Sequence, residues 1–355
     1  MNPNTVLESS TRRYLVKDVR CEGDLTTVCN ATYANGSGNN NVILKVTRDK
    51  ADNDLVWNEM GILSFMFPPS QAQDGFYKYL PRILDSFETK DGRRVNVFAP
   101  IDGYVSLEEV LRAYPQGLNF RDVVWMYKRL LVAIGFAHSK GIIHGAILPS
   151  HVLIHPIEHG AKLLDWSYAL NFAEVVVPKA CCHGTAGCKG VGDKHWCDDK
   201  PLAAAKKTST PTAPKKVHNA WEKLLEDAEY DPDPVNITLP KGPSADPNHM
   251  FIRAMSVEWE NFYAPEILVK RTPMPCTDIY MAAKIAVALL GGDSVTNQLP
   301  DSVPPQIKAF LQASLLPATR ARTQDAWDLH EALDKLLFQL VGKPTYRPFS
   351  MPAKN

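Results

Sequence analysis

The stretch Gly141-Ile-Ile-His-Gly-Ala-Ile-Leu-Pro-Ser-His-Val-Leu-Ile154 decides how this 355-residue chain is interpreted. It is a polar loop that ends in a short apolar run. The segment before it, Phe120 to Ser139, has apolar residues at helical spacing and is predicted to be a helix. A further short run, Lys162 to Leu164, follows the loop and leads into Asp165. The loop is therefore expected between a long helix and short strands.

Composition narrows the class of protein. Hydrophobic residues make up 45% of the chain and charged residues 22%, so most of the chain can bury a core. Basic and acidic residues are equal at 39 each, which argues against a surface built for nucleic acid. The most apolar stretch, Ile279 to Leu290, is too short to span a membrane and contains Lys284.

The sequence also predicts where the protein resides. The N-terminus has no apolar core of a secretory signal. The cysteines number seven, an odd count that favours a reducing compartment over a disulfide framework. We therefore expect a cytoplasmic protein, or one from another reducing intracellular compartment.

The character of the chain changes near residue 100. Val19 to Tyr33 alternates in polarity, and with the β-rich run Val42 to Val46 it flanks an Asn-Gly turn, which is typical of a hairpin. From Ser106 onward the pattern is mostly helical, and Ser-Leu-Glu-Glu there is typical of a helix start. The other predicted elements are a helix at Asp54 to Met66, a strand at Val95 to Phe98, and helices at Tyr280 to Leu290 and Ala326 to Leu340.

The stretch quoted first resembles the catalytic loop of eukaryotic-type protein kinases, H-R-D-L-x-x-x-N followed by an apolar strand. Other motifs of that family follow in the family's order. They are Val42-Ile-Leu-Lys45 for V-A-I-K, Glu59 for the glutamate that pairs with the lysine, Asp165-Trp-Ser for D-F-G, Ala264-Pro-Glu266 for A-P-E, Asp278 at the start of the next helix, and Arg320, with Arg322 as the alternative, for the arginine that pairs with the A-P-E glutamate.

The resemblance implies a two-lobed α+β kinase-like fold. The N-lobe is expected at residues 1–100 and the C-lobe at 101–355, with a hinge near Phe98 to Gly103. The C-lobe is expected to carry a long insertion, 172–250, where kinases have the activation segment.

The departures from the family lie at its chemical centre, although His144 is kept. Ala146 stands where the family has the aspartate that orients the substrate hydroxyl and accepts its proton. His151 stands where it has an asparagine ligand of the second magnesium, and Mg²⁺ prefers oxygen to a nitrogen ligand. Leu148 replaces a lysine that commonly steadies the transferred phosphate. No catalytic residue is therefore assigned in this degenerate loop, although His151 and Asp102 are conceivable bases.

The residues that would hold a nucleotide match the family's motifs more closely than the catalytic loop does. Lys45 is expected to contact phosphate, Glu59 to hold Lys45, and Asp165 to bind one magnesium ion, so ATP with Mg²⁺ is an expected weak ligand. Only Gly23 of the Gly-rich loop glycines matches, which leaves side chains where phosphate needs close backbone approach. The alternative is that Lys45 and Glu59 form only a structural ion pair and that Asp165 caps a turn.

The insertion contains a Cys/His cluster that could hold zinc. Zn²⁺ takes four such ligands in a tetrahedron, and the glycines nearby would let a short loop surround it. Four ligands are expected from Cys181, Cys182, His183, Cys188, His195 and Cys197. The alternative is an exposed loop with unrelated thiols. Lys200 to Lys216 follows and is predicted to be a flexible linker.

Three functions remain open from the sequence. The first is a pseudokinase that acts by binding a protein partner. The second is an active but atypical Ser/Thr kinase with a base from elsewhere. The third is a scaffold or nucleic-acid module in which the zinc cluster and the basic linker matter most. Ala146 favours the first over the second, and the neutral net charge disfavours the third.

Overall fold

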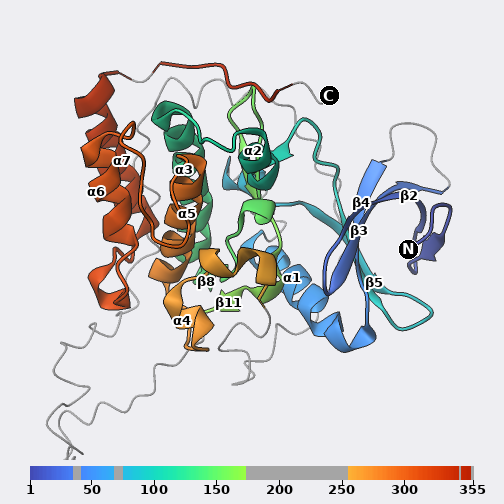
Figure 1. Ribbon diagram of the computed structural model, residues 1–355. Helices are drawn as coiled ribbons and strands as arrows, with labels where there is room; N and C mark the ends of the chain where they lie inside the picture. Colours follow the sequence, from blue (N-terminus) through green and yellow to red (C-terminus); the bar gives the residue numbers. More distant parts are fainter. Residues whose placement is uncertain (35–40, 68–74, 173–254, 344, 353–355) are drawn as a thin grey trace, which may run out of the picture. The chain divides into compact units, whose positions relative to one another are not determined.

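The computed structural model describes the whole chain apart from residues 35–40, 68–74, 173–254, 344 and 353–355. The described residues all fall within one compact unit. Figure 1 shows a strand-rich part built from the first hundred residues and a helix-rich part built from the rest. Among the described helices, none is long and apolar enough to cross a membrane.

The strand-rich part is a six-stranded sheet in the order β1-β2-β3-β4-β6-β5, with every neighbouring pair antiparallel. Its strands are β1 (Val6–Glu8), β2 (Arg13–Glu22), β3 (Thr26–Tyr33), β4 (Asn41–Thr47), β5 (Ile83–Glu88) and β6 (Arg94–Phe98). The pairing of β3 with β4 confirms the predicted hairpin. The prediction of one strand from Val19 to Tyr33 was wrong, because the Gly23 N–H bonds to the Thr26 carbonyl oxygen at 2.9 Å and closes a tight turn.

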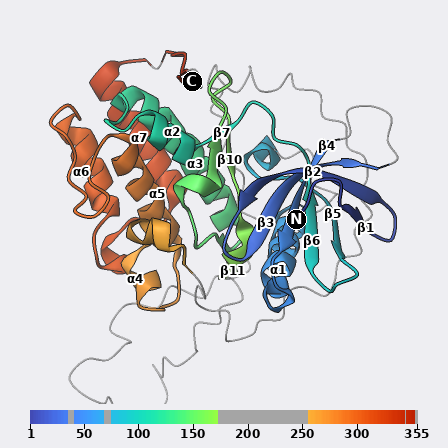
Figure 2. The same cartoon turned by 45° about the vertical axis from the view of Figure 1, so that its right-hand side comes forward.

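Helix α1 (Asn53–Met66) packs against this sheet through β4, β5 and β6 (Figure 2). A short 3₁₀ turn, Lys50–Asp52, leads into it, and the side chain of Asp49 caps that turn by accepting from the Ala51 N–H. The buried face of α1 carries Leu55, Val56, Met60 and Leu63, with the single carboxylate Glu59 among them. A charged group on an otherwise apolar face requires partners, which places Glu59 in the site described below.

The helix-rich part is built around α3, whose bounds match the sequence prediction. Its helices are α2 (Leu107–Ala113), α3 (Phe120–Ser139), α4 (Pro265–Leu268), α5 (Pro275–Leu289), α6 (Pro305–Ser314) and α7 (Ala326–Val341). Helix α3 packs on both α5 and α7. Gly135 permits the approach of α7, because a Cβ there would lie 2.7 Å from the Trp327 ring. Short 3₁₀ turns complete this part at Gly75–Tyr79, Val257–Phe262 and Thr319–Ala321.

Two small antiparallel sheets fix the loops that carry the candidate site. Strand β8 (Ile142–Ile143) pairs with β11 (Leu170–Asn171), and β9 (Val152–Ile154) pairs with both β7 (Val105–Ser106) and β10 (Ala161–Leu163). The loop from β8 to β9 therefore runs beside the loop from β10 to β11. Ala146 and His151 lie on the first loop, with His151 ending the 3₁₀ turn Pro149–His151, and Asp165 lies on the second, just before the turn Trp166–Tyr168.

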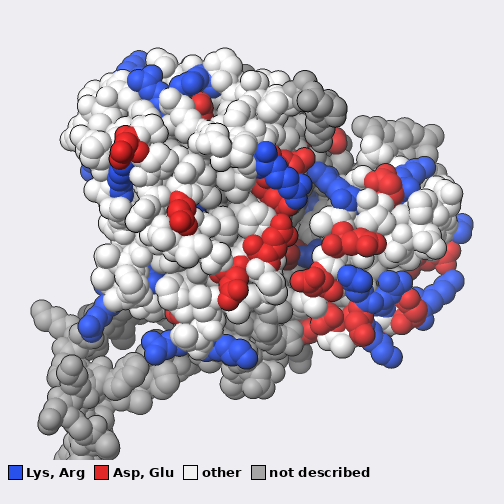
Figure 3. All heavy atoms as spheres, in the orientation of Figure 1, with Lys and Arg blue, Asp and Glu red and all other residues white. Residues whose placement is uncertain are grey.

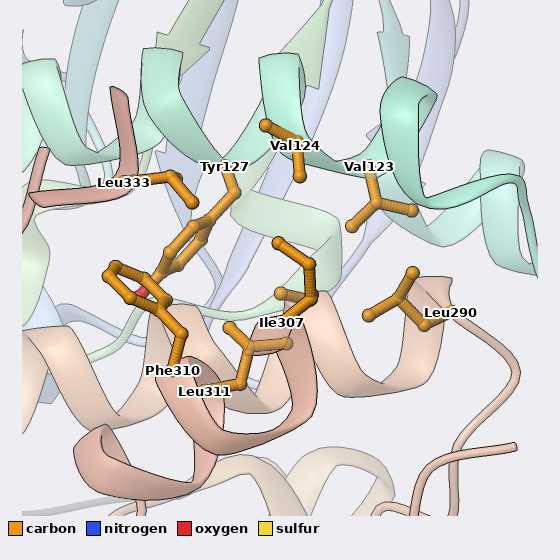
Figure 4. Close-up of a pocket in the computed structure, with 9 residues that line it drawn as sticks. Val123, Val124, Tyr127, Leu290, Ile307, Phe310, Leu311 and Leu333 are labelled. Atoms are coloured by element: carbon orange, nitrogen blue, oxygen red, sulfur yellow. The ribbon is translucent and has the colours of Figure 1, made fainter. Parts of the chain in front are cut away.

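A small apolar void lies between α3, α5, α6 and α7. Figure 4 shows Val123, Val124 and Tyr127 of α3 facing Ile307 and Leu311 of α6 across it. Its volume of about 10 Å³ is scarcely enough for one water molecule. The void is therefore a packing imperfection of the helical core and not a ligand site.

Candidate functional site

Lys45 stands at the centre of the candidate site. It lies on β4 with its side chain buried at 7% exposure. Its Nζ is 2.7 Å from Asp165 Oδ1, 2.8 Å from Ser167 Oγ, and 3.1 Å and 3.2 Å from the two oxygens of Glu59. An ammonium group has three N–H donors, so these acceptors engage all of them. Burial alone would lower the pKa of Lys45, but the carboxylates of Asp165 and Glu59 raise it above its ordinary value.

Glu59 is buried and accepts hydrogen bonds from three directions. Beyond Lys45, its Oε1 accepts from the Trp166 N–H at 3.1 Å and its Oε2 accepts from Asn96 Nδ2 at 3.3 Å. Burial raises the pKa of Glu59 above its ordinary value, and Lys45 opposes that effect. The carboxylate thus joins the sheet, α1 and the segment after Asp165.

Asp165 sits in the left-handed backbone region, with φ 61° and ψ 68°. Both of its carboxylate oxygens face protein nitrogens: Oδ1 faces Lys45 Nζ at 2.7 Å, and Oδ2 faces His151 Nε2 at 3.3 Å. Burial would raise the pKa of Asp165, but Lys45 and His151 together hold it well below its ordinary value. Asp165 is therefore an ionised group with its charge largely compensated within the protein.

Asp278, which is fully buried at the start of α5, accepts hydrogen bonds from the backbone of the loop that carries Ala146. Its two oxygens accept the backbone N–H groups of His144 and Gly145, each at 2.8 Å, and His138 Nε2 lies 2.9 Å away. Gly145 stands where the family pattern has arginine, and its φ of 75° favours glycine. That departure is readable in the sequence and adds to those at Ala146 and His151.

His144 is a buried neutral side chain. Its Nδ1 accepts from the Ala146 N–H at 3.2 Å, so its Nε2 carries the hydrogen and donates to the Leu164 carbonyl oxygen at 2.8 Å. Burial lowers the pKa of His144 to about 4. The ring also meets the buried ring of Trp166 edge-on at 4.5 Å. His144 therefore supports the two loops and has no free nitrogen for proton transfer.

At the position of the family's catalytic aspartate, Ala146 is completely buried. Its methyl group can neither accept a proton nor orient a hydroxyl. Its carbonyl oxygen lies 2.8 Å from His151 Nδ1, and its N–H is taken by His144. The position thus serves the loop's internal hydrogen bonding.

Carboxylates gather near the boundary between the sheet and the helical part, as Figure 3 shows. Burial, followed by the carboxylates of Glu108 and Asp165, raises the pKa of Cys21, which lies near the end of β2 beside the turn to β3. Ile43 shares the face of β4 with Lys45, and it packs against the core of the helical part where the motif V-A-I-K has only an alanine methyl. The negative charge of the carboxylates disfavours a polyphosphate.

The Gly-rich loop position is reduced to a short turn. Gly23 offers its N–H to Thr26 and its carbonyl oxygen accepts from Arg48 at 3.0 Å. A Cβ at Gly23 would lie 3.3 Å from the Thr26 oxygen, so the glycine serves this turn. The backbone N–H of Gly23 is therefore already engaged and is not available to phosphate.

Glu266 of the A-P-E motif pairs with Arg322, which corrects the sequence prediction of Arg320. Arg322 makes two bonds to the carboxylate, at 2.8 Å and 3.1 Å, and its side chain is fully buried. Thr277 donates to the same carboxylate at 2.7 Å, and the Arg322 guanidinium lies over the Tyr280 ring. Arg320 is exposed, because it falls within the short 3₁₀ turn Thr319–Ala321 on the solvent side.

Sequence reasoning missed several polar partners of the site. Ser167 bonds to Lys45, and Asn96 bonds to both Glu59 and the Val56 carbonyl oxygen. Asn58 of α1 donates to the carbonyl oxygens of Ser167 and Ala169 at 3.0 Å and 2.9 Å. Asn58 and Asn96 belong to no motif. Ser167 is the third residue of the Asp165-Trp-Ser motif, so its place was visible in the sequence but its bond to Lys45 was not.

The residues of the site do not fit a magnesium centre of the family's type. Mg²⁺ requires oxygen ligands in near-octahedral geometry. Asp165 offers oxygens that already face Lys45 and His151, and the second family ligand is an imidazole. In the described part of the chain, no group of three or more His, Cys, Asp or Glu side chains could hold a metal ion. The predicted zinc cluster, with the linker after it, lies outside the described residues and stays a prediction.

Comparisons with known proteins agree with this architecture. The solved structure of vaccinia related kinase 3 is similar over 99% of this chain and 95% of that chain, with a TM-score of 0.59 and 16% sequence identity. Casein kinase II subunit alpha' of Saccharomyces cerevisiae is 38% identical over 48 residues, 14% of each chain. The probable casein kinase II subunit alpha homolog of Encephalitozoon cuniculi is 29% identical over 73 residues, 21% of this chain and 23% of that protein.

The chain spans less than a quarter of the length of these two curated relatives. No protein-family model matches it. The fold, however, is that of a protein kinase, as the sequence predicted. The chain is a protein-kinase-like protein whose catalytic loop departs from the family at the positions described above.

Proposed function

We propose that this protein is a pseudokinase, which acts by binding a protein partner and binds ATP weakly at most. The observation that carries the proposal is Ala146. Transfer of a phosphoryl group to a hydroxyl needs a group that orients that hydroxyl and receives its proton. Loss of a general base typically costs about 10²- to 10⁴-fold in rate.

The state of the neighbouring side chains supports the same proposal. His144 is buried with both ring nitrogens bonded, so it is no substitute base. Lys45 has its donors engaged by Glu59, Asp165 and Ser167, and a phosphate would have to compete for them. The carboxylates near the boundary between the sheet and the helical part oppose the approach of a polyphosphate. A kinase-like body with little chemistry leaves protein recognition as the function that fits it best.

The test is a phosphoryl-transfer assay with radiolabelled ATP and generic protein substrates. Wild type should incorporate no more label than a Lys45→Arg variant, which keeps a positive charge for the buried carboxylates. Ala146→Asp alone should also remain inactive, because Leu148 and His151 still leave the transferred phosphate and a second metal unsupported. Robust transfer by wild type that is lost in Lys45→Arg would overturn the proposal.

A second candidate, an atypical Ser/Thr kinase, rests on His151. Its ring is part-exposed beside Asp165, with Nδ1 held by the Ala146 carbonyl oxygen and Nε2 directed to the carboxylate. Only Nε2 could receive a proton, and only after it leaves Asp165. If transfer is observed, its loss in His151→Ala would assign the base; transfer that survives in His151→Ala would place the base elsewhere.

A further inference from the structure

We propose that His151 excludes Mg²⁺ from Asp165, so that this one residue determines whether the cleft can use Mg²⁺-bound nucleotide. The inference deepens the proposed function, because it concerns the same cleft and accounts for weak ATP binding. The ligand class excluded is Mg²⁺ together with a nucleoside triphosphate. Two protein nitrogens take one lone-pair position on each carboxylate oxygen of Asp165.

First, each carboxylate oxygen of Asp165 already faces a protein nitrogen. Its Oδ1 lies 2.7 Å from Lys45 Nζ and its Oδ2 lies 3.3 Å from His151 Nε2. Each carboxylate oxygen has two lone-pair positions, and a cation that takes the one directed at Lys45 or at His151 must displace that nitrogen. Lys45 is also held by Glu59 and Ser167, so it does not move away without leaving the buried carboxylate of Glu59 unpaired. Displacement therefore has to occur on the His151 side.

The second step is the fixed direction of the His151 ring. Nδ1 lies 2.8 Å from the Ala146 carbonyl oxygen, which can only accept, so Nδ1 carries a hydrogen. Nε2 faces the Asp165 carboxylate and bonds to it only when it carries a hydrogen as well, which makes the ring a cation. The backbone is held as well: the His151 N–H bonds to the Leu148 carbonyl oxygen, and the His151 carbonyl oxygen accepts from the Leu164 N–H at 2.8 Å. Turning the ring away would break the bond to Ala146.

The third step is ligand chemistry. An asparagine side chain would present an amide oxygen toward the same space, and Mg²⁺ accepts such a ligand. An imidazole presents a nitrogen, which Mg²⁺ disfavours, and its ring is rigid where an amide could turn. Changing this single side chain should therefore restore an oxygen ligand without altering Lys45, Glu59 or Asp165.

The experiment compares stabilisation by ATP in EDTA and in Mg²⁺, measured by thermal unfolding and by titration calorimetry. Wild type should gain nothing from Mg²⁺, whether its response to ATP is small or absent. His151→Asn should gain Mg²⁺-dependent binding, with ATP affinity at least about 10-fold higher in Mg²⁺ than in EDTA, a change of the size that ligand-shell substitutions produce. His330→Asn, the same change on α7 outside the cleft, should behave like wild type.

A Mg²⁺-dependent response in wild type, or none in His151→Asn, would overturn the inference. If His151→Asn fails to fold, His151→Gln offers the same amide on a longer side chain and is judged by the same criterion. The pseudokinase proposal fails separately, by Lys45-dependent phosphoryl transfer in wild type. Mg²⁺-dependent binding without transfer would therefore remove only the role of His151.

Discussion

At the scale of single residues, we expect the buried ion pair between Glu266 and Arg322 to contribute strongly to stability. Removing one partner of a buried pair leaves the other charge uncompensated and typically costs about 3–5 kcal/mol. Arg322→Ala should lower the free energy of unfolding by about that amount, measured by urea denaturation. Arg320→Ala, two residues away on an exposed side chain, is the matched control and should change it by less than about 0.5 kcal/mol. Equal effects of the two substitutions would contradict the assignment.

The choice between these two arginines shows what spacing can and cannot predict. The A-P-E motif and a late arginine before the final helix were both visible in the sequence. The two candidates lie two residues apart around a short 3₁₀ turn, Thr319–Ala321. Which one faces the core depends on where that turn ends, and no local pattern fixes the end of such a turn. The sequence therefore predicted that Glu266 pairs with a late arginine, but it could not decide which of the two arginines makes the pair.

The burial of His144 leads us to expect that the stability of the fold depends on pH. Burial lowers its pKa in the folded protein to about 4, below the ordinary value of 6.5. The unfolded chain then binds a proton that the folded protein does not, so stability is complete above pH 6.5 and falls as the pH drops toward 4. This difference between the folded and the ordinary pKa corresponds to about 3 kcal/mol of unfolding free energy.

The measurement is the free energy of unfolding in urea at several pH values between 7 and 4. His159 also has a pKa lowered to about 4 by burial, so the contribution of His144 is the difference between wild type and His144→Gln. That variant should lose less stability on acidification than wild type does. Parallel pH profiles for the two proteins would show that His144 is protonated as easily in the fold as in the unfolded chain.

At the scale of elements, the start of α2 is the clearest agreement between sequence and structure. The Glu109 N–H bonds to Ser106 Oγ at 3.1 Å, and the Ser106 N–H bonds to Glu109 Oε2 at 2.9 Å. Ser106→Ala should cost about 1 kcal/mol of stability, because the Glu109 N–H loses its acceptor. Ser106→Thr keeps the hydroxyl and should retain most of that stability. Equal unfolding midpoints for Ser106→Ala and wild type would show that water replaces the cap at no cost.

Elements with strong periodicity or caps were predictable, and elements defined by distant contacts were not. Helix α3 repeats apolar residues over 20 residues, and its bounds were predicted as observed. The break between β2 and β3 was missed, since Gly23-Asp24-Leu25 interrupts an alternating run without proline or an Asn-Gly pair. Strands β8 and β11 have two residues each, and only their mutual pairing makes them strands.

The candidate site was predictable in outline for the same reason. Lys45, Glu59 and Asp165 were found because a family motif surrounds each of them. The other side chains that bond to these residues were not predictable. Ser167 contacts Lys45, and His151 contacts Asp165, only because the fold brings them together. A motif identifies a residue's place, whereas the partners that decide its chemistry come from segments far apart in the sequence.

At the scale of the whole molecule, the buried cluster of Lys45 ties the sheet to the helical part. Lys45 belongs to β4, Glu59 to α1, and Asp165 to the loop after β10, so the cluster connects elements of both parts. If nucleotide plays little role, this cluster must hold the parts together by itself. The cluster is then a structural core and not a resting catalytic site.

This interpretation makes a prediction that a nucleotide-holding role alone would not. Lys45→Met should destabilise the protein by about 3–5 kcal/mol without any ligand, because Glu59 stays buried beside an ionised Asp165 with no positive partner. Lys45→Met combined with Glu59→Leu should recover part of that loss, since the second change removes the unpaired carboxylate. Urea unfolding of both variants without nucleotide measures the difference. If Lys45→Met is as stable as wild type, the cluster does not hold the two parts together, and the gathering of three charged side chains there must be explained by a bound ligand instead.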